Sequence, residues 1–207
     1  SNLTPAKQSI TIEDVLTMRS GLAWEELTYP YWHSSNTFGK MIRSPDLLEF
    51  VLGRPISDNP GETFNYNSGA SHLLSAILVE ATGMSTYAFA KQYLFDPMEI
   101  DVSVENWTRD PGDTEINTGG WGLKMNPIDM AKIGLLFLHN GTWHGAQILS
   151  PEWVRVATSS QTDTPYPTMD YGYQWWVEQS GIYAAFGYAG QAIVVVPELE
   201  IVVVFTA

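Results

Sequence analysis

The sequence contains no cysteine and few cationic residues, and both shortages exclude classes of function. Without cysteine there is no disulfide, no thiolate nucleophile and no Cys-based zinc site. Ten Lys and Arg residues stand against 23 Asp and Glu residues, which gives a net charge of −13. A nucleic-acid-binding surface needs clustered cations, whereas these cations are scattered singly. We therefore expect no nucleic-acid partner.

Long apolar runs are missing as well. No run approaches the roughly 20 residues that a membrane-spanning helix needs, so we expect no membrane span. With 44% apolar and 16% charged residues among 207, the composition is typical of a folded globular chain of one domain or two small ones. Ser1 and Asn2 resemble a cloning remnant and are set aside from the fold.

The first helix signals stand near the start of the chain. Thr11 can cap a helix that reaches about Arg19, and Asp14 stands where it would complete a capping box. Ser44 followed by Pro45 is typical of the start of a second, short helix.

Further helix signals follow in the middle of the chain. Apolar residues at helical spacing predict a strong helix over 68–82 that ends at Gly83. Three later helices are predicted to begin at the capping signals Ser85, Asn126-Pro127 and Ser150-Pro151. The stretches 22–43 and 96–122 are expected to be irregular, and a loop as long as the second is often functional.

Strand signals take over after residue 170. Runs of β-branched and aromatic residues predict strands at Tyr171–Glu178, Ile182–Phe186, Gln191–Val196 and Ile201–Thr206. The last two runs are almost entirely apolar, which suits strands buried on both faces. We therefore predict an α+β fold in which a mainly helical region, 1–170, is followed by an antiparallel sheet, 171–207.

The sequence has no motif for a nucleophilic serine. It lacks the Gly-x-Ser-x-Gly elbow. A Ser-x-x-Lys pair would place a hydroxyl and an amine on one face of a helix, where the amine can take the hydroxyl proton. The residues three positions before the five lysines are Thr4, Thr37, Ala88, Trp121 and Asp129, so this pair is absent too.

The four histidines do not suggest a site either. His33 has no sequence context that favours catalysis, and His72 lies inside a predicted helix as a packed or surface residue. His139 and His144 flank an Asn-Gly turn, but no third metal ligand accompanies them. We expect no metal and no cofactor.

Tyr66 lies in a loop directly before the strong helix, where the helix dipole favours an anion. A phenol ordinarily titrates near 10, and each unit of lowering needs about 1.4 kcal/mol of differential stabilisation. A nearby ammonium could provide this stabilisation. The alternative interpretation, an aromatic staple for the helix, is equally compatible with the spacing.

A second candidate stretch is 186–191, at the head of an apolar strand. Its small residues would let a substrate approach the backbone and would leave N–H groups free. The pattern alone fits a tight turn or a bulge as well.

Five blocks of the chain, in this order, resemble the β-lactamase-related family of serine hydrolases, which includes class C β-lactamases, DD-peptidases, esterases and 6-aminohexanoate-dimer hydrolase. The blocks are Ile10–Glu26, Pro60–Gly83, Gly119–Val154, Tyr171–Val177 and Phe186–Ala207. Because they cover nearly the whole chain, the resemblance implies a β-lactamase/transpeptidase-like fold.

The resemblance also implies an acyl-enzyme mechanism. Such enzymes acylate the serine of a Ser-x-x-Lys motif, while that lysine and a tyrosine shuttle the proton. Tyr66 falls on the catalytic tyrosine, and Ser68 stands where many members have Asn.

Gly187, Tyr188 and Ala189, followed by Gly190, fall where other members have Lys-Thr-Gly on the strand that offers an N–H to the oxyanion. The missing lysine removes the cation that helps hold a β-lactam carboxylate, which favours an esterase or amidase. We expect Trp121 to form part of the wall of the same cleft.

The family's Ser-x-x-Lys segment lies upstream of Ile10, and a further strand and helix usually follow the position of Ala207. We therefore expect a fragment that is incomplete at both termini, inactive alone, and self-associating or paired with the missing segment. The resemblance favours a periplasmic or secreted location.

The predicted function is part of a serine hydrolase that cleaves a small amide or ester substrate through an acyl-serine. Two alternatives stay open at this point. One is a non-catalytic binding or scaffold protein that has kept the fold, and the other is a β-lactamase or DD-peptidase.

Overall fold

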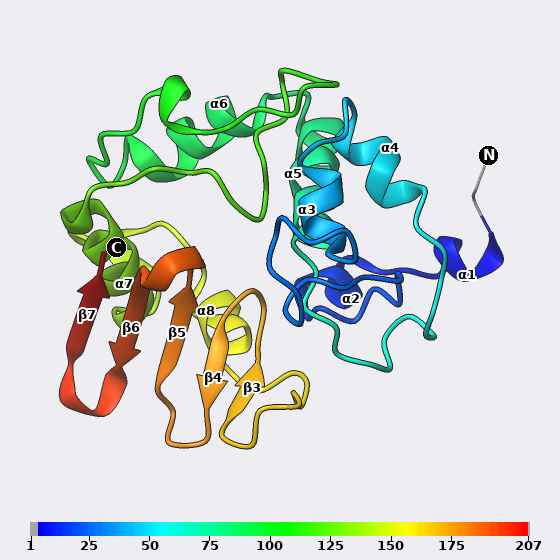
Figure 1. Ribbon diagram of the computed structural model, residues 1–207. Coiled ribbons are helices and arrows are strands. Elements are labelled where there is room, and N and C mark those ends of the chain that lie inside the picture. The colour runs from blue at the N-terminus through cyan, green and yellow to red at the C-terminus, as the bar shows by residue number, and fades with distance from the viewer. Residues whose placement is uncertain (1–3, 207) are drawn as a thin grey trace. The chain divides into compact units, whose positions relative to one another are not determined.

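A computed structural model describes residues 4–206, so residues 1–3 and Ala207 lie outside the described residues. The chain forms two compact units, shown in Figure 1. The helical unit comprises Ser1–Ala88 and Trp107–Leu123, and the sheet unit comprises Phe89–Asn106 and Lys124–Ala207.

The helical unit is built from short helices around one longer helix. In chain order these are α1 (Pro5–Gln8), α2 (Ile12–Leu16), α3 (Thr37–Met41), α4 (Leu47–Leu52), α5 (Ser68–Thr82) and the start of α6 (Thr86–Ala90). Its core is a cluster of buried apolar side chains: Leu22, Trp24, Phe38, Met41, Leu47 and Val51. Helix α5 has no room for a side chain at Gly69, because a Cβ there would lie 2.5 Å from the Trp24 ring and 2.8 Å from Val51.

The predicted helix over 68–82 is confirmed at both ends. The Asn67 side chain accepts a hydrogen bond from the Ala70 N–H at 2.8 Å and caps the helix. Gly83 adopts φ +67 and ends the helix, and its N–H donates to the Val79 carbonyl at 2.8 Å.

The first predicted helix is correct at its start and too long at its end. Thr11 and Asp14 form the expected capping box, with N···O distances of 2.9 and 3.1 Å. Helix α2 ends at Leu16 and not near Arg19, because Met18 adopts the left-handed φ of 60°, which a helix cannot continue through.

The second predicted helix begins later than Pro45. Asp46 is its N-cap and accepts the Glu49 N–H at 2.7 Å, while the Ser44 hydroxyl donates to the Asp46 carbonyl at 2.8 Å. Helix α3 was missed within 22–43, since its single turn has no apolar period and depends on the Asn36 cap.

The sheet unit begins with helical segments and ends in strands. The helical segments are the rest of α6, the π-helix η1 (Lys91–Phe95), η2 (Val104–Asn106), α7 (Pro127–Leu138), α8 (Pro151–Ala157), η3 (Tyr188–Gly190) and η4 (Pro197–Leu199). The strands are β1 (Thr142–Trp143), β2 (Ala146–Gln147), β3 (Met169–Tyr171), β4 (Trp176–Glu178), β5 (Tyr183–Phe186), β6 (Ala192–Val196) and β7 (Ile201–Phe205). Strands β3 to β7 form one antiparallel sheet in chain order, which confirms the predicted α+β class (Figure 1).

One run predicted as a single strand, 171–178, is two strands. Strands β3 and β4 pair through Tyr171 opposite Trp176, and Gln174 between them adopts φ 63°. Gly172 permits this turn because a Cβ there would lie 2.1 Å from the Ala157 carbonyl oxygen. A close approach from a distant helix is invisible in the local sequence.

Helix α7 covers one face of β6 and β7 (Figure 1). The prediction that both faces of the strand are buried is nearly met by β6, whose Val195 is fully buried. The prediction is wrong for β7 among residues 4–206, because Ile201, Val203 and Phe205 are 43%, 38% and 54% exposed.

None of the single helices described within residues 4–206 is long and apolar enough to cross a membrane. Only a sharply bent pair, α5 joined to α6 and η1, passes the test of length and composition together.

Gly134 tests the packing of α7 on the sheet. A Cβ at this position would lie 2.4 Å from Val202 Cγ1 and 3.0 Å from Ile193 Cγ2. We expect Gly134→Ala to lower the free energy of unfolding by about 1–3 kcal/mol, although alanine is the better helix former. Ile128→Ala, at a position on the same helix that is 70% exposed, should change it by less than about 0.5 kcal/mol. Urea denaturation of both variants decides, and a stabilised Gly134→Ala protein would contradict the packing.

Candidate active site

Tyr66 lies in the loop that enters helix α5. The loop is anchored through Asn65, whose N–H donates to the Met18 carbonyl at 2.8 Å and whose side-chain amide donates to the Trp24 carbonyl at 3.1 Å. The Tyr66 side chain is half-buried.

The surroundings of Tyr66 favour its neutral form. Burial, together with the nearby Glu26 and Tyr31 groups, raises the pKa of Tyr66 to about 12, and a hydrogen bond from the Ser68 side chain to the phenolate acts in the opposite direction. At neutral pH the phenol therefore keeps its proton in this environment.

Glu26 is a buried carboxylate beneath the start of α5, only 4% exposed. Its Oε1 accepts the Ser68 hydroxyl at 2.6 Å, and its Oε2 accepts the Ser68 N–H at 3.0 Å and the Trp24 indole N–H at 2.7 Å. Burial raises the pKa of Glu26, and the bonds from Ser68 and Trp24 counteract the rise. These three donors satisfy a charge that would otherwise be costly to bury.

Sequence reasoning missed Glu26. It lies in the block Ile10–Glu26 that carries the family resemblance, but nothing in its spacing separates it from its neighbour Glu25. The structure separates them, since Glu26 is buried while Glu25 is half-buried and accepts the Thr28 N–H.

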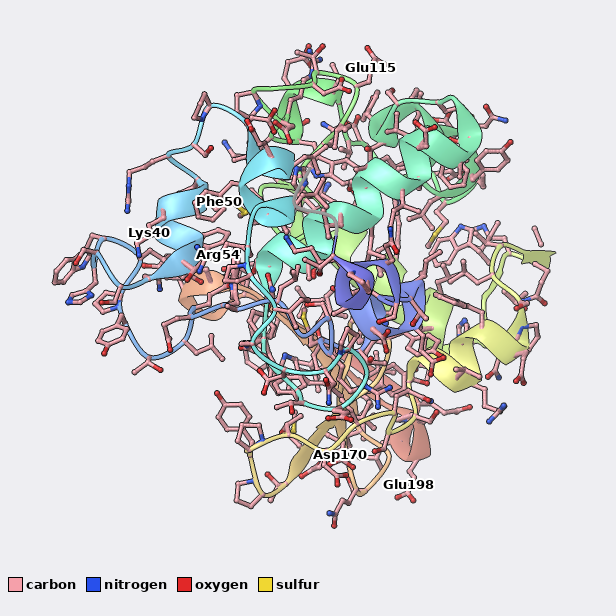
Figure 2. All side chains as sticks on the ribbon, turned by 90° about the vertical axis from the view of Figure 1, so that its right-hand side faces the viewer. Lys40, Phe50, Arg54, Glu115, Asp170 and Glu198 are labelled. Carbon is pink, nitrogen blue, oxygen red and sulfur yellow. The ribbon has the colours of Figure 1, made fainter. Side chains whose placement is uncertain are left out.

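The segment before Glu26 is held against the chain that follows α4. Leu22 forms a β-bridge with Ile56, and the Ala23 N–H donates to the Pro55 carbonyl at 2.8 Å. Arg54 donates to the Ala23 carbonyl at 3.1 Å, and its guanidinium lies 5.8 Å from the centre of the Phe50 ring (Figure 2). These contacts hold the backbone of residues 22–23 in place and thereby position Glu26.

The loop 119–121 lies against the first turn of α5. A Cβ on Gly120 would lie 2.9 Å from the Ser68 carbonyl oxygen, and one on Gly119 would lie 2.3 Å from the Ser71 carbonyl oxygen. Trp121 packs edge-on against Phe38, with ring centres 5.1 Å apart. The structure thus brings the predicted wall residue Trp121 to the helix turn that carries Ser68.

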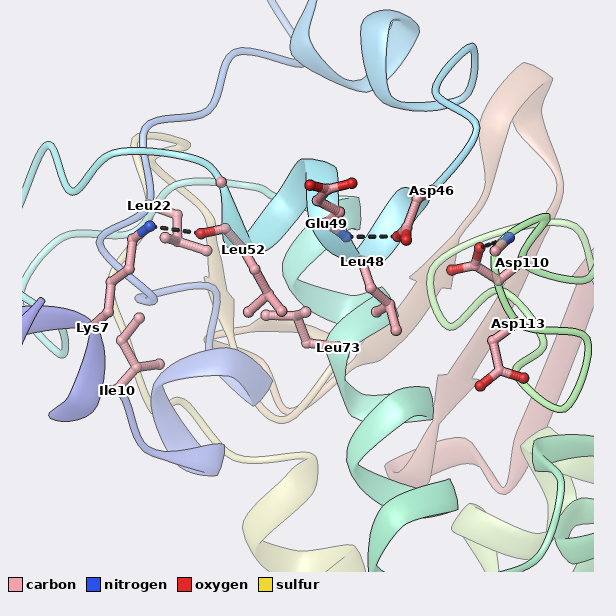
Figure 3. Close-up of a pocket in the computed structure, with 12 residues that line it drawn as sticks. Lys7, Ile10, Leu22, Asp46, Leu48, Glu49, Leu52, Leu73, Asp110 and Asp113 are labelled. Carbon is pink, nitrogen blue, oxygen red and sulfur yellow. Dashed lines mark hydrogen bonds between the residues drawn. The ribbon is translucent and has the colours of Figure 1, made fainter. Parts of the chain in front are cut away.

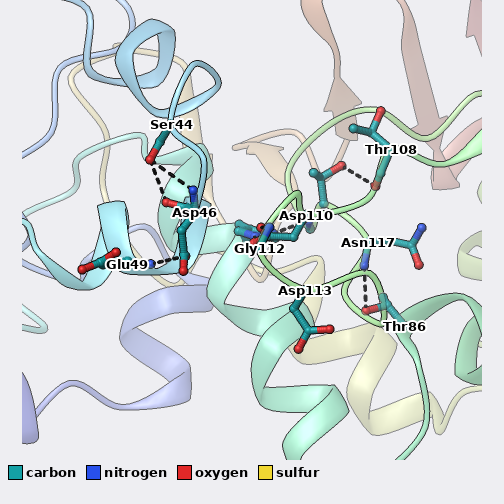
Figure 4. Close-up of polar contacts among 12 residues, drawn as sticks. Ser44, Asp46, Glu49, Thr86, Thr108, Asp110, Gly112, Asp113 and Asn117 are labelled. Atoms are coloured by element: carbon teal, nitrogen blue, oxygen red, sulfur yellow. Dashed lines mark hydrogen bonds and ion pairs between the residues drawn. The ribbon is translucent and has the colours of Figure 1, made fainter.

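A buried His–Asp pair anchors this loop to α5. His72 and Asp110 are 0% and 1% exposed, and His72 Nε2 lies 2.7 Å from Asp110 Oδ2. The Gly119 N–H donates to His72 Nδ1 at 3.3 Å, so the proton of a neutral ring lies on Nε2. The other Asp110 oxygen accepts the Gly112 N–H at 2.8 Å (Figure 4). His72 is therefore a packed residue, one of the two predicted interpretations.

The predicted oxyanion residues lie in the sheet unit. Gly187, Tyr188, Ala189 and Gly190 connect β5 to β6, and all four are exposed. The Gly187 N–H donates to the Gln191 carbonyl at 2.8 Å, and Ala189 and Gly190 adopt φ values of 67° and 104°. This geometry is that of a tight turn. The role of these residues in oxyanion binding stays a prediction.

A groove of about 970 Å3 lies elsewhere in the helical unit (Figure 3). Apolar side chains that include Leu22 and Leu73 line it together with the carboxylates Asp46, Glu49 and Asp113. None of the predicted site residues belongs to its lining, so its volume does not identify the site of chemistry. Residues 4–206 contain no group of three or more His, Asp or Glu residues placed to hold a metal ion.

A family model for beta-lactamases matches residues 1–207, and the chain belongs to the beta-lactamase family. A 6-aminohexanoate-dimer hydrolase of Paenarthrobacter ureafaciens is 25% identical over 174 residues, a match that covers 77% of this chain and 42% of that protein. The chain therefore spans less than half the length of this curated relative.

Two solved structures share the fold. A Bacillus anthracis protein, provisionally assigned as a 6-aminohexanoate-dimer hydrolase, superposes with a TM-score of 0.78 at 22% identity and covers 94% of this chain and 54% of its own. An octameric penicillin-binding protein homologue of Pyrococcus abyssi superposes with a TM-score of 0.69 at 18% identity and covers 99% of this chain and 53% of its own. The β-lactamase/transpeptidase-like fold is thereby confirmed, and the chain covers part of it.

The raised pKa of Glu26 predicts a pH-dependent stability. The folded state binds this proton more tightly than the unfolded state, so ionised Glu26 opposes folding at neutral pH, and the opposition vanishes as the pH falls below the ordinary value of 4.5. We expect Glu26→Gln to unfold at higher urea concentration than the wild type at pH 7, and to lose this advantage below pH 4.5.

Parallel urea titrations at pH 7 and pH 4 make the comparison. Glu49→Gln, which removes an exposed carboxylate of the same unit, should match the wild type in both. A wild type that is the more stable protein at pH 7 would mean that the hydrogen bonds to Glu26 outweigh its burial.

Proposed function

We propose that this chain is part of a serine hydrolase that cleaves a small amide or ester through an acyl-serine intermediate. The observation that carries the proposal is the buried Glu26–Ser68 pair beside Tyr66 at the start of α5, in a chain of the beta-lactamase family. A phenol held by buried polar groups at a helix N-terminus is suited to moving a proton.

In the proposed reaction, a serine hydroxyl attacks the substrate carbonyl and gives up its proton to a basic group. Tyr66 and the lysine of a Ser-x-x-Lys motif share this proton and return it to the leaving group, and water then releases the acyl group. Residues 1–207 contain no such motif, so we propose that both the serine and the lysine belong to a segment outside them. The lysine ammonium would lower the pKa of Tyr66 from about 12 and make it a usable base.

The remaining predicted residues receive supporting roles. We propose Ser68 as the partner of the Tyr66 hydroxyl and Trp121 as a substrate-contacting wall. In the sheet unit, the backbone of Gly187–Gly190 is proposed to offer N–H groups to the oxyanion.

The substrate proposal rests on the same turn. Gly187, Tyr188 and Ala189 carry no cation, which favours a neutral amide or ester over a β-lactam with its carboxylate. The named activity of the Paenarthrobacter relative, hydrolysis of the 6-aminohexanoate dimer, supports a small amide. A β-lactamase or DD-peptidase is the alternative suggested by the penicillin-binding protein homologue with this fold, and a non-catalytic binding or scaffold protein is the other.

Labelling of the natural polypeptide by a fluorophosphonate tests the proposal. We expect one serine of a Ser-x-x-Lys motif to be labelled, and Tyr66→Phe to lower turnover of a short-chain nitrophenyl ester by about 10²–10⁴-fold. Tyr93→Phe, which removes the hydroxyl of an exposed tyrosine that is not among the proposed site residues, serves as the control and should keep the rate. A polypeptide that is never labelled would favour the scaffold alternative, and an unchanged rate in Tyr66→Phe would assign the proton transfer to another group.

The exposed face of β7 supports a further proposal about partners. Ile201, Val203 and Phe205 form an apolar strip on β7, an edge strand that has a neighbouring strand on one side only among residues 4–206. We propose that this strip pairs with a second polypeptide segment, from another copy or from outside residues 1–207.

Sedimentation of the 207-residue chain tests this pairing. The chain should self-associate, and Val203→Lys should shift it toward the monomer, whereas Gln179→Lys adds the same charge at another exposed position and should not. A wild-type chain that sediments as a monomer at all concentrations would contradict self-pairing.

A further inference from the structure

The Ser68 hydroxyl has one proton and two neighbours that can take it. One is the Glu26 carboxylate, 2.6 Å from Ser68 Oγ, and the other is the Tyr66 oxygen, which shares a hydrogen bond with the Ser68 side chain. A hydroxyl can donate only once, although it can accept twice.

The geometry decides which neighbour receives the proton at rest. The Glu26 carboxylate is fixed by two further donors, the Ser68 N–H at 3.0 Å and the Trp24 indole N–H at 2.7 Å. A charged acceptor at 2.6 Å forms a stronger hydrogen bond than a neutral phenol oxygen. Ser68 therefore donates to Glu26, and its lone pairs accept the proton of Tyr66.

We propose that Glu26 is a positioning residue that acts through Ser68: it holds the Ser68 proton, and thereby keeps Tyr66 the hydrogen-bond donor of the site. The proposal rests on the proposed function only in taking Tyr66 as the proton shuttle. It assigns Glu26 control over how readily the shuttle releases its proton.

Two effects of Glu26 oppose ionisation of Tyr66. The first is the repulsion between the carboxylate and a phenolate, to which the neighbouring Tyr31 group adds. The second is that the Ser68 hydroxyl already donates its proton to Glu26. A Tyr66 phenolate can accept a hydrogen bond from Ser68 only if the bond from Ser68 to Glu26 is broken. The charge repulsion from Glu26 would remain if Ser68 were replaced, whereas the second effect requires the Ser68 hydroxyl.

Glu26→Gln separates this arrangement from a purely structural one. The glutamine oxygen can still accept the Ser68 and Trp24 N–H groups, but its amide must donate to Ser68 Oγ. The Ser68 hydroxyl then donates to Tyr66. The same residues stay in contact, but each hydrogen bond of the series 26–68–66 has its donor and acceptor exchanged.

The test is a pH titration of Tyr66 in the 207-residue chain, followed by NMR of ¹³Cζ-labelled tyrosine and assigned with Tyr66→Phe. Wild-type Tyr66 should ionise at about 12. In Glu26→Gln its midpoint should fall by about one pH unit or more. In the double variant Glu26→Gln, Ser68→Ala the fall should be smaller, because the phenolate then has no Ser68 hydroxyl to donate to it.

Asp14→Asn is the matched control. Asp14 is also a buried carboxylate that accepts a backbone N–H at a helix start, but it belongs to α2 and does not contact Ser68 Oγ in the capping box it forms with Thr11. The Tyr66 midpoint should be the same as in the wild type. Should Glu26→Gln fail to fold, Ser68→Ala alone still tests the polarity. It removes the acceptor of the Tyr66 proton and should lower the midpoint, whereas an unchanged or raised midpoint would overturn the proposal.

An unchanged Tyr66 midpoint in folded Glu26→Gln would overturn the proposal, and so would a fall of equal size with and without Ser68. Neither result depends on catalysis. Conversely, a natural polypeptide that resists fluorophosphonate labelling would remove the hydrolase function while leaving a Ser68-dependent shift of Tyr66 intact.

Discussion

A buried carboxylate holds together the parts of the helical unit from which a catalytic role is proposed. Glu26 joins the extended segment 22–26 to the first turn of α5, and the same turn supports the loop that carries Trp121. Hydrogen bonds from Trp24 and Ser68 offset part of the free-energy cost of burying this carboxylate, but its pKa is still raised. Groups held in this way, at some expense to stability, are typical of functional sites.

Much of the fold follows from local sequence signals. Helix α5 was predicted over 68–82 because apolar spacing and Gly83 agree, and the structure adds the Asn67 cap. The Ser150 and Asn126 caps mark the starts of α8 and α7 equally well. One error arose where a distant contact overrides the local pattern. One such contact, the approach of Gly172 to the Ala157 carbonyl, turns a predicted single strand into β3 and β4.

The candidate site was predictable only in part. Tyr66 and Ser68 are identified by a motif at a helix start, whereas Glu26 is 42 positions away from Ser68 and becomes recognisable only when the fold places it there. The role of His72 was likewise not settled by the sequence. A histidine on a helix takes its role from its partner, which here is Asp110, 38 positions further along the chain. Pairings across such separations are set by topology and leave no periodic trace in the sequence.

The roles proposed for Tyr66 and Glu26 are tested most directly by a crystal structure of the natural polypeptide after reaction with a fluorophosphonate. We expect a labelled serine whose Oγ lies within hydrogen-bonding reach of the Tyr66 hydroxyl, roughly 2.6–3.2 Å, while Ser68 still donates to Glu26. A label on a serine remote from Tyr66, or a Tyr66 side chain turned into the core with Glu26 bound to other donors, would contradict these roles.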